Sequence, residues 1–239
     1  AIDKKEYDKN DVAVMSGIGC SSRTPTYLDF NTIHTTHGRA LAFATGLKLA
    51  RPKMTVIVVM GDGDAVGIGG NHFIHAARRN MDLKVIVYNN NIYGMTGGQV
   101  SPTTPSLKKA TTARYGNMER SFDICELAKS TGAVYVARST TYHAQMLEKY
   151  ILKSFDRKGF TVVEAMTHCP TTYGRLNKIK EPVAGMQFQK DHFIPKSAWD
   201  KLPEDKREDK FPMGEFADLD KEDFVTRYLE LVESLKEEK

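Results

Sequence analysis

Short apolar runs alternate with polar, glycine-rich loops along most of the chain. Runs of this length that are rich in valine and isoleucine are typical of strands buried on both faces. They predict strands at residues 12–15, 56–60, 85–88, 134–137 and 160–166. Segments with helical periodicity lie between and after them, at residues 39–50, 70–80, 122–129, 140–156 and 221–236. Strand–helix–strand crossovers join parallel strands, so the pattern predicts an α/β fold, a mostly parallel sheet with helices on both faces.

The predicted helices differ in how they should pack. The helix at residues 39–50 is rich in small apolar residues, and we expect it to be buried. The predicted core face of the helix at residues 70–80 consists of Phe73, Ile74, Ala76 and Ala77. The predicted core face of the helix at residues 140–156 consists of Met146, Leu147, Tyr150 and Ile151. From residue 174 on the chain is charged. We therefore expect one α/β domain over residues 1–175 and a C-terminal arm over residues 176–239.

Composition narrows the class of protein. Hydrophobic residues make up 41% and charged residues 27% of the 239 residues, as in ordinary globular proteins, and no apolar run approaches the ~20 residues that span a bilayer. The formal net charge of +4 is mild, and no concentrated basic patch with interleaved aromatic residues indicates nucleic-acid binding. A weakly basic surface still favours an acidic protein partner. The charged start without Met indicates a fragment, and no secretory signal is visible.

Two of the predicted strands end in polar motifs. Gly61-Asp62-Gly63-Asp64 follows one strand and Asn89-Asn90-Asn91 follows the next. The carboxyl ends of parallel strands share one edge of the sheet, where α/β proteins bind ligands. Oxygens of Asp62 and Asn90 suit Mg²⁺, and the glycines let a pyrophosphate approach the backbone. Because Gly-Asp-Gly is also a common turn, the motif alone leaves a purely structural role open.

Three cysteines, Cys20, Cys125 and Cys169, are widely separated. This spacing argues against a disulfide framework and predicts a reducing, cytoplasmic location. Cys20 and Cys169 lie in loops that should meet at the same sheet edge. They are either small buried hydrophobes or ligands of a metal or an iron–sulfur cluster, which takes four thiolates. Cys125 falls in a helical pattern and is assigned to the core.

Other polar residues in these loops have two possible roles each. Arg23 is either a cation for a substrate carboxylate or a surface residue that braces its loop. His34 and His37 have a spacing compatible with zinc but no third ligand nearby, and we favour hydrogen bonding by His37 near a cofactor or substrate. Residues 96–98 either cradle a pyrophosphate or form an ordinary turn.

Several motifs, taken in chain order, resemble one family. They are GIGCSSR at residues 17–23, HTTHGRA at 34–40, GDGD at 61–64, NHFIHAARRN at 71–80 and YGMTGGQ at 93–99. Together they resemble the β subunits of 2-oxoacid:ferredoxin oxidoreductases and, within that family, the 2-oxoglutarate enzymes. The resemblance spans residues 12–175 and implies a thiamine-diphosphate (TPP) binding fold.

The resemblance implies where the cofactors and substrate bind. Mg²⁺ is expected on Asp62, Asn90 and the backbone oxygen of Ile92. A [4Fe–4S] cluster is expected on Cys20 and Cys169 with a Cys-x-x-Cys that this sequence lacks, either because the sequence begins downstream of it, which we favour, or because the cluster is absent. The residues expected at the reaction centre are Arg23, which would select the distal carboxylate of 2-oxoglutarate, His37 and Met95. The residues expected to bind the cofactors are Ile18, Gly19, Cys20, Gly61, Asp62, Gly63, Asp64, Asn90, Ile92, Thr96 and Gly97.

The implied function is that of the β subunit of a CoA-acylating 2-oxoglutarate:ferredoxin oxidoreductase with TPP, Mg²⁺ and a [4Fe–4S] cluster. Its partners would be an α subunit, ferredoxin, 2-oxoglutarate and CoA, without nucleic acid or membrane. Residues 1–175 would bind the TPP diphosphate and residues 176–239 would pack on the complex. The α subunit would supply the carboxylate that activates TPP, so the chain alone should catalyse nothing. Two alternatives stay open: a sister enzyme for pyruvate or another 2-oxoacid, and a non-catalytic interaction subunit.

Overall fold

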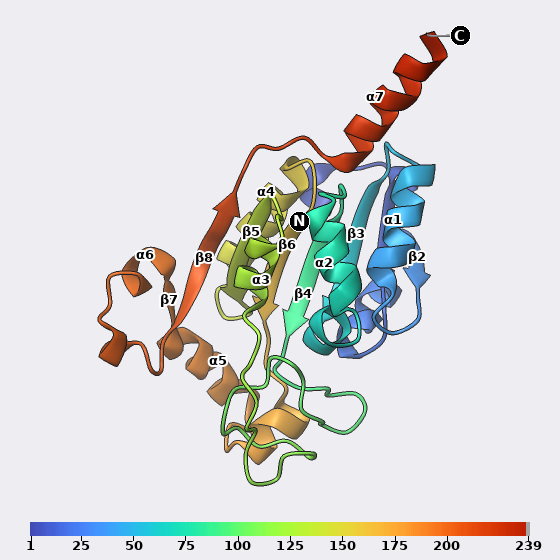
Figure 1. Ribbon diagram of the computed structural model, residues 1–239. Coiled ribbons are helices and arrows are strands. Elements are labelled where there is room, and N and C mark those ends of the chain that lie inside the picture. The colour runs from blue at the N-terminus through green and yellow to red at the C-terminus, as the bar shows by residue number, and fades with distance from the viewer. Residues whose placement is uncertain (238–239) are drawn as a thin grey trace.

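Eight strands form one sheet in the order β2-β1-β3-β4-β6-β5-β8-β7 (Figure 1). The computed structural model describes residues 1–237. The strands are β1 Val12–Ser16, β2 Asn31–His34, β3 Thr55–Gly61, β4 Lys84–Asn89, β5 Tyr135–Thr140, β6 Thr161–Met166, β7 Phe193–Pro195 and β8 Phe211–Asp218. The helices are α1 Ala40–Ala50, α2 Gly70–Arg78, α3 Ile124–Ser130, α4 Ala144–Asp156, α5 Pro182–His192, α6 Lys196–Trp199 and α7 Phe224–Glu237. All neighbours pair in parallel except β5 and β8, so the predicted mostly parallel sheet is confirmed.

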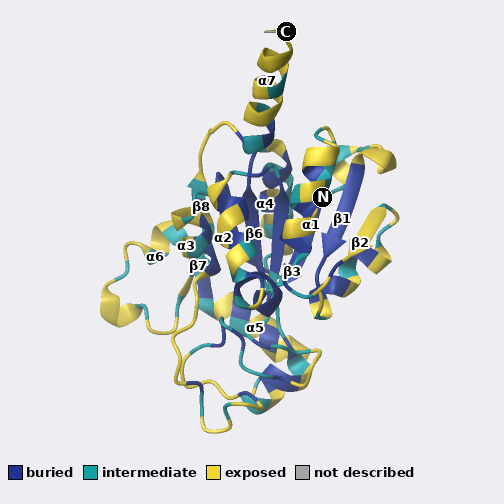
Figure 2. Ribbon diagram, turned by 45° about the vertical axis from the view of Figure 1, so that its right-hand side comes forward, coloured by how far each residue is buried: buried dark blue, intermediate teal, exposed yellow. Residues whose placement is uncertain are grey.

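Helices cover both faces of the sheet, as predicted. Alternate residues of β3 point to opposite faces: Val58 and Met60 pack in a core with α1, α2 and α3, whereas Ile57 and Val59 pack in a second core with α4. Figure 2 shows the buried strands beneath helices whose outer surfaces are exposed. Each fully buried Val, Ile or Met stabilises the fold by about 1.5–3 kcal/mol. Among the described residues, none of the helices has the length and apolar character that crossing a membrane requires.

Three packing predictions are wrong in part. Helix α1 is amphipathic rather than buried, because Phe43 lies on its exposed face. On α2, Ile74 is exposed beside the buried Phe73, and on α4, Met146 is exposed while Tyr150 is buried. Successive helical residues are about 100° apart, so a residue adjacent in sequence to a core position can point to solvent.

The C-terminal arm contributes two strands, β7 and β8, to the sheet. β8 pairs antiparallel with β5, with a register shift between Val136 and Ala137. The sequence pattern missed β8 because Pro212 and Gly214 interrupt it, and it missed β2 because all four of its residues are exposed. Helix α7 projects away from the sheet (Figure 1). The division of the chain after residue 175 stays a prediction.

A buried ion cluster stabilises the amino ends of the central strands. Asp82 accepts from Lys48 and Lys84, each at 2.7 Å, and both lysine side chains are almost fully buried. Burial alone would raise the pKa of Asp82, but the charges of Lys84 and Lys48 outweigh it and the pKa is lowered. Asp82 is therefore ionised at neutral pH and pairs with two buried lysines.

Candidate active site at the carboxyl ends of the strands

A cleft lies among the loops that leave the carboxyl ends of β1, β3, β4 and β6. Figure 1 shows loops beyond the arrowheads of β4 and β6. Parallel topology brings these loops together. The predicted residues that line the cleft are Ile18, Gly19, Cys20, His37, Gly61, Asp62, Gly63, Asp64, Asn90, Ile92, Met95 and Thr96. The lining residues that the sequence analysis did not predict are Ser21, Tyr88, Tyr93, Gly94, Thr167 and His168. The predicted convergence of the loops is therefore confirmed.

Asp62 and Asn90 follow the adjacent parallel strands β3 and β4. The carboxylate of Asp62 is almost fully buried, and its Oδ2 accepts hydrogen bonds from Ser101 Oγ at 2.6 Å and Thr103 Oγ1 at 2.5 Å. Burial raises the pKa of Asp62, and the two hydroxyl groups oppose that shift. Asn90 Oδ1 accepts from the backbone N–H of Ile92 at 3.2 Å. The cleft thus holds a carboxylate and an amide oxygen, the hard ligands that Mg²⁺ prefers.

Asp64 joins the loops around the cleft. Its Oδ1 accepts from the backbone N–H groups of Gly38 at 2.7 Å and Ile18 at 3.3 Å, and it lies 2.5 Å from His37 Nδ1. A side chain at position 17 would overlap the Asp64 carboxylate, which explains Gly17. Asp64 therefore fixes the orientation of His37 and the approach of the loops that follow β1 and β2.

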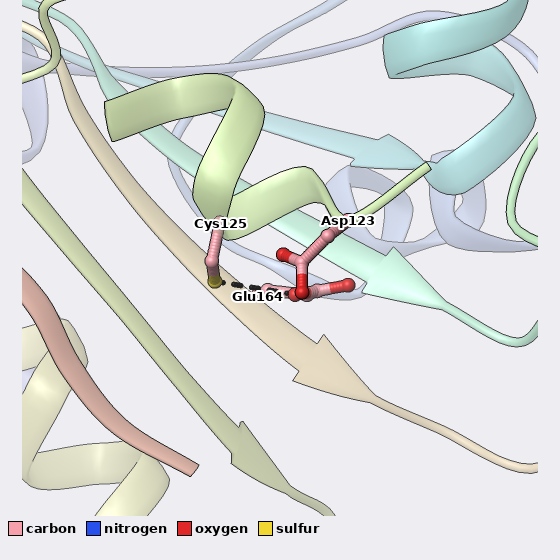
Figure 3. Close-up of side chains that lie close together, drawn as sticks. All are labelled: Asp123, Cys125 and Glu164. Atoms are coloured by element: carbon pink, nitrogen blue, oxygen red, sulfur yellow. Dashed lines mark hydrogen bonds between the residues drawn. The ribbon is translucent and has the colours of Figure 1, made fainter. Parts of the chain in front are cut away.

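A buried ion pair lies beneath this edge of the sheet. Arg138 Nε donates to Glu164 Oε2 at 2.6 Å, and its Nη2 donates to Asp123 Oδ1 at 2.6 Å. Figure 3 shows Asp123, Cys125 and Glu164 close together, and among the described residues they form the one group of three whose atoms are spaced as metal ligands. The guanidinium already pairs with both carboxylates, so we interpret this group as an ion-pair network rather than a metal site. Burial disfavours the charged guanidinium, but the charge of Glu164 outweighs it and raises the pKa of Arg138.

Close polar contacts connect this ion pair to Asp62. Asn89 Nδ2 donates to Glu164 Oε1 at 2.8 Å, and Asn89 Oδ1 lies 3.0 Å from Thr103 Oγ1. Thr103 in turn donates to Asp62 Oδ2. The first asparagine of the Asn89-Asn90 pair is thus buried and supports the loop, while the second lines the cleft.

Cys20 and Cys169 meet at Gly94. A Cβ built on Gly94 would lie 3.3 Å from Cys20 Sγ and 3.6 Å from Cys169 Sγ, so the two sulfurs are at most 6.9 Å apart, the sum of these distances. Loops after β1 and β6 therefore bring the two thiols to one place, as expected of ligands of a shared cluster. Cys125 is fully buried in the main core, as predicted, and burial raises the pKa of its thiol.

Three predicted residues, Arg23, Gly97 and Cys169, are absent from the cleft lining. Arg23 is exposed, and its Nε and Nη2 donate to Tyr27 Oη at 3.3 and 3.2 Å, as a residue that braces its loop would. Gly97 has a φ of +115°, a conformation that favours glycine. It lies in a turn where Thr96 Oγ1 donates to Gln99 Oε1 at 2.6 Å.

Two lining residues escaped the sequence analysis although each is next to a predicted cysteine. Within residues 1–237, Ser21 Oγ and His168 Nε2 are buried side-chain atoms without a hydrogen-bond partner. Burial lowers the pKa of His168, so its imidazole is neutral at pH 7. Their positions directly beside Cys20 and Cys169 were the available signal.

A family described as "Thiamine pyrophosphate enzyme, C-terminal TPP binding domain" matches residues 17–165. This match runs from the loop after β1 into β6 and includes the loops that carry Asp62 and Asn90. The fold and the cleft therefore define the TPP-binding domain of a thiamine pyrophosphate enzyme.

More specific relatives cover most of the chain. A 2-oxoglutarate synthase subunit KorB from Methanocaldococcus jannaschii is 50% identical over 238 residues, covering 100% of this chain and 88% of the relative. A 2-oxoacid:ferredoxin oxidoreductase subunit beta from Saccharolobus solfataricus is 43% identical over 173 residues, covering 72% of this chain and 57% of the relative. The solved structure of 2-oxoglutarate:ferredoxin oxidoreductase from Magnetococcus marinus, with 2-oxoglutarate, coenzyme A and succinyl-CoA bound, matches with a TM-score of 0.83 at 32% identity, covering 96% of this chain and 79% of that chain. The chain belongs to the β-subunit family of the 2-oxoacid:ferredoxin oxidoreductases, which confirms the resemblance seen in its motifs.

Proposed function

We propose that this chain is the β subunit of a 2-oxoglutarate:ferredoxin oxidoreductase, which interconverts 2-oxoglutarate and CoA with succinyl-CoA and CO₂ and exchanges the two electrons with ferredoxin. One observation carries the proposal: hard oxygen ligands at Asp62 and Asn90 share a cleft with the meeting point of Cys20 and Cys169. The KorB relative that matches the whole chain supports 2-oxoglutarate as the substrate.

Asp62, Asn90 and the backbone oxygen of Ile92 would hold Mg²⁺ and, through it, the diphosphate of TPP. The cleft fits this group because the buried Ser21 Oγ is a hydroxyl without a partner among residues 1–237. It lies beside Gly61, where a Cβ would be 3.3 Å away from it. A free hydroxyl donor next to a glycine without a side chain suits an approaching phosphate oxygen.

Cys20 and Cys169 would supply two of the four thiolates of a [4Fe–4S] cluster. Their convergence on Gly94 supports a shared ligand. The other two thiolates would come from beyond these 239 residues, since Cys125 is buried in the core.

When bound, TPP supplies the carbanion chemistry of 2-oxoacid decarboxylation and the cluster takes up electrons singly. The residues of this chain would bind and orient the reactants. His37, held by Asp64, would hydrogen-bond to the substrate or cofactor, and the half-exposed Met95 would border the substrate. Arg23 would leave Tyr27 and pair with the distal carboxylate of 2-oxoglutarate. A partner α subunit would supply the carboxylate that activates TPP, so activity would require both subunits.

The test is turnover by the full-length complex, purified anaerobically with its α subunit. We expect TPP-stimulated, CoA-dependent reduction of methyl viologen with 2-oxoglutarate and little with pyruvate. Asp62→Asn should abolish this activity, whereas Asp29→Asn, at an exposed ion pair with Lys9, should leave it unchanged. Arg23→Met should lower kcat/KM for 2-oxoglutarate more than for pyruvate. Turnover of pyruvate alone would overturn the choice of substrate, and full activity of an assembled Asp62→Asn complex would overturn the metal assignment.

A further inference from the structure

The net positive charge of the molecule is concentrated in two neighbouring segments. Residues 107–120 and 170–180 hold seven cations and one carboxylate, a net charge of 7 − 1 = +6, against +4 for the whole chain. The rest of the chain is therefore net negative. The seven cations, here called the basic patch, are Lys108, Lys109, Arg114, Arg120, Arg175, Lys178 and Lys180.

The charges of the basic patch are not used in folding. All seven residues are exposed. Within residues 1–237, the one ion pair that involves them joins Lys180 to Glu181 at 3.9 Å, between two exposed groups. Like charges gathered in this way repel one another. Because the arrangement gives no stability to the isolated chain, a ligand or partner outside the chain explains it better than the fold does.

The two segments are held together by hydrogen bonds between the Asn177 side chain and the backbone of Lys109. Asn177 Nδ2 donates to the carbonyl oxygen of Lys109 at 2.9 Å, and Asn177 Oδ1 accepts from the N–H of Lys109 at 2.9 Å. Residues 107–117 fold back as a hairpin-like loop, in which the N–H of Leu107 donates to Asn117 at 2.7 Å and the N–H of Asn117 donates to Lys108 at 2.8 Å. The patch therefore has a defined shape.

Apolar side chains stand among the cations. Leu107 is 72% exposed, Met118 is 85% exposed and Tyr115 is fully exposed. An exposed tyrosine and methionine surrounded by unpaired cations are typical of a protein–protein contact, where apolar anchors supply affinity and charges supply steering. The loops at residues 107–120 and 170–180 lie at the end of the molecule beyond the sheet, at the bottom of Figure 2.

The first segment of the basic patch is anchored in an apolar cluster that includes the cysteine loop. Ala110 and Ala113, which lie between the cations of the first segment, are in one apolar cluster with Ile92, Cys169 and Tyr173. The first segment of the patch thus packs in the same apolar cluster as Cys169, the residue proposed to ligate the iron–sulfur cluster. A partner bound at the patch would be brought near that cluster, where electrons leave.

We propose that the basic patch is the docking surface for an acidic protein that carries single electrons, such as ferredoxin. The inference rests on the proposed function, and it adds the place on this chain where the electron acceptor binds. Two such carriers would dock in turn for each 2-oxoacid oxidised, because the oxidation releases two electrons. The alternatives are that the patch contacts the α subunit or binds nucleic acid.

The test compares two acceptors in the full complex with its α subunit. Lys108→Glu/Lys109→Glu reverses two charges of the patch, and the matched control Lys201→Glu/Lys206→Glu reverses two exposed charges on the C-terminal arm. At low ionic strength we expect the KM for ferredoxin to rise about tenfold in the patch variant, with a weaker dependence on salt. The rate with methyl viologen, which needs no docking surface, should stay unchanged, and the control should match the wild type with both acceptors.

Each other result overturns the proposal. An unchanged KM for ferredoxin in an assembled patch variant would place the docking surface elsewhere. Loss of the α subunit on size exclusion would make the patch a subunit interface. Loss of RNA binding by the patch variant, with its ferredoxin KM intact, would assign the patch to nucleic acid. If the wild-type complex fails to reduce even methyl viologen with 2-oxoglutarate, the proposed function itself fails, which separates the two cases.

Discussion

Glu164→Gln removes the charge from the buried ion pair beneath the metal loop. The variant keeps the shape of the side chain and an oxygen that accepts from Asn89, but it takes away the carboxylate that lies 2.6 Å from Arg138 Nε. The side chain of Glu164 is 1% exposed and that of Arg138 is 6% exposed, so water cannot replace the lost partner. The one carboxylate that the guanidinium keeps is Asp123, whose side chain is 43% exposed.

Leaving one member of a buried ion pair unpaired costs about 3–5 kcal/mol. Because Asp123 still pairs with Arg138, we expect the low end, a loss of about 3 kcal/mol in the free energy of unfolding. For a chain of this size the loss corresponds to a fall in melting temperature of about 6–12 °C. The matched control is Glu215→Gln, which breaks a half-exposed pair with Lys153 and should cost at most about 1 kcal/mol.

Differential scanning calorimetry of the wild type and the variants, run side by side, measures these differences. Combining Glu164→Gln with Arg138→Met removes both charges, so the double variant should regain most of the lost stability. A Glu164→Gln protein that melts within about 2 °C of the wild type would refute the reasoning. So would a double variant that is less stable than Glu164→Gln alone.

Three further predictions concern the cleft and the base of the sheet. Thr103→Val removes a hydroxyl that holds Asp62, and we expect the Mn²⁺ affinity of the complex, measured by electron paramagnetic resonance, to fall about tenfold, while Thr103→Ser and the buried control Thr161→Val keep it. Gly94→Val places a side chain against the thiols of Cys20 and Cys169, so the iron content of the anaerobically purified complex should fall. A normal iron content would contradict the proposed cluster site. Asp82→Asn leaves two buried lysines without their carboxylate partner and should lower the free energy of unfolding, measured with urea at pH 7, by about 3 kcal/mol. The pKa of Asp82 in the folded protein is lowered from 3.8, so the stability difference between wild type and variant is fully present above pH 3.8 and shrinks as the pH falls through the folded pKa. A stability difference that stays constant down to low pH would contradict this prediction.

The sequence predicted the central strands and the cofactor loops because both depend on local patterns. The apolar run at residues 56–60 could only be a buried strand or a short piece of helix, and the glycines after it favoured the strand. Once two parallel strands were placed, the common edge followed from topology, and with it the proximity of Asp62 and Asn90.

Contacts between segments that are distant in the sequence could not be predicted from sequence patterns. Ser101 and Thr103 reach Asp62 from 39 and 41 residues away, through a loop without periodicity that gives no signal of where it folds. The two halves of the basic patch are separated in sequence by α3, β5, α4 and β6, so their charges look dilute along the chain. Strand β8 was missed because its pairing with β5 depends on an edge that exists only after the sheet has formed.

The central claim is that one cleft holds a TPP–magnesium site beside the point where two cluster thiols meet. A crystal structure of the anaerobically purified complex with TPP and Mg²⁺ tests it most directly. The account predicts Mg²⁺ about 2.1 Å from oxygens of Asp62, Asn90 and Ile92, and iron bonded to Cys20 and Cys169. A diphosphate bound elsewhere, or both thiols without iron in a fully active complex, would contradict it.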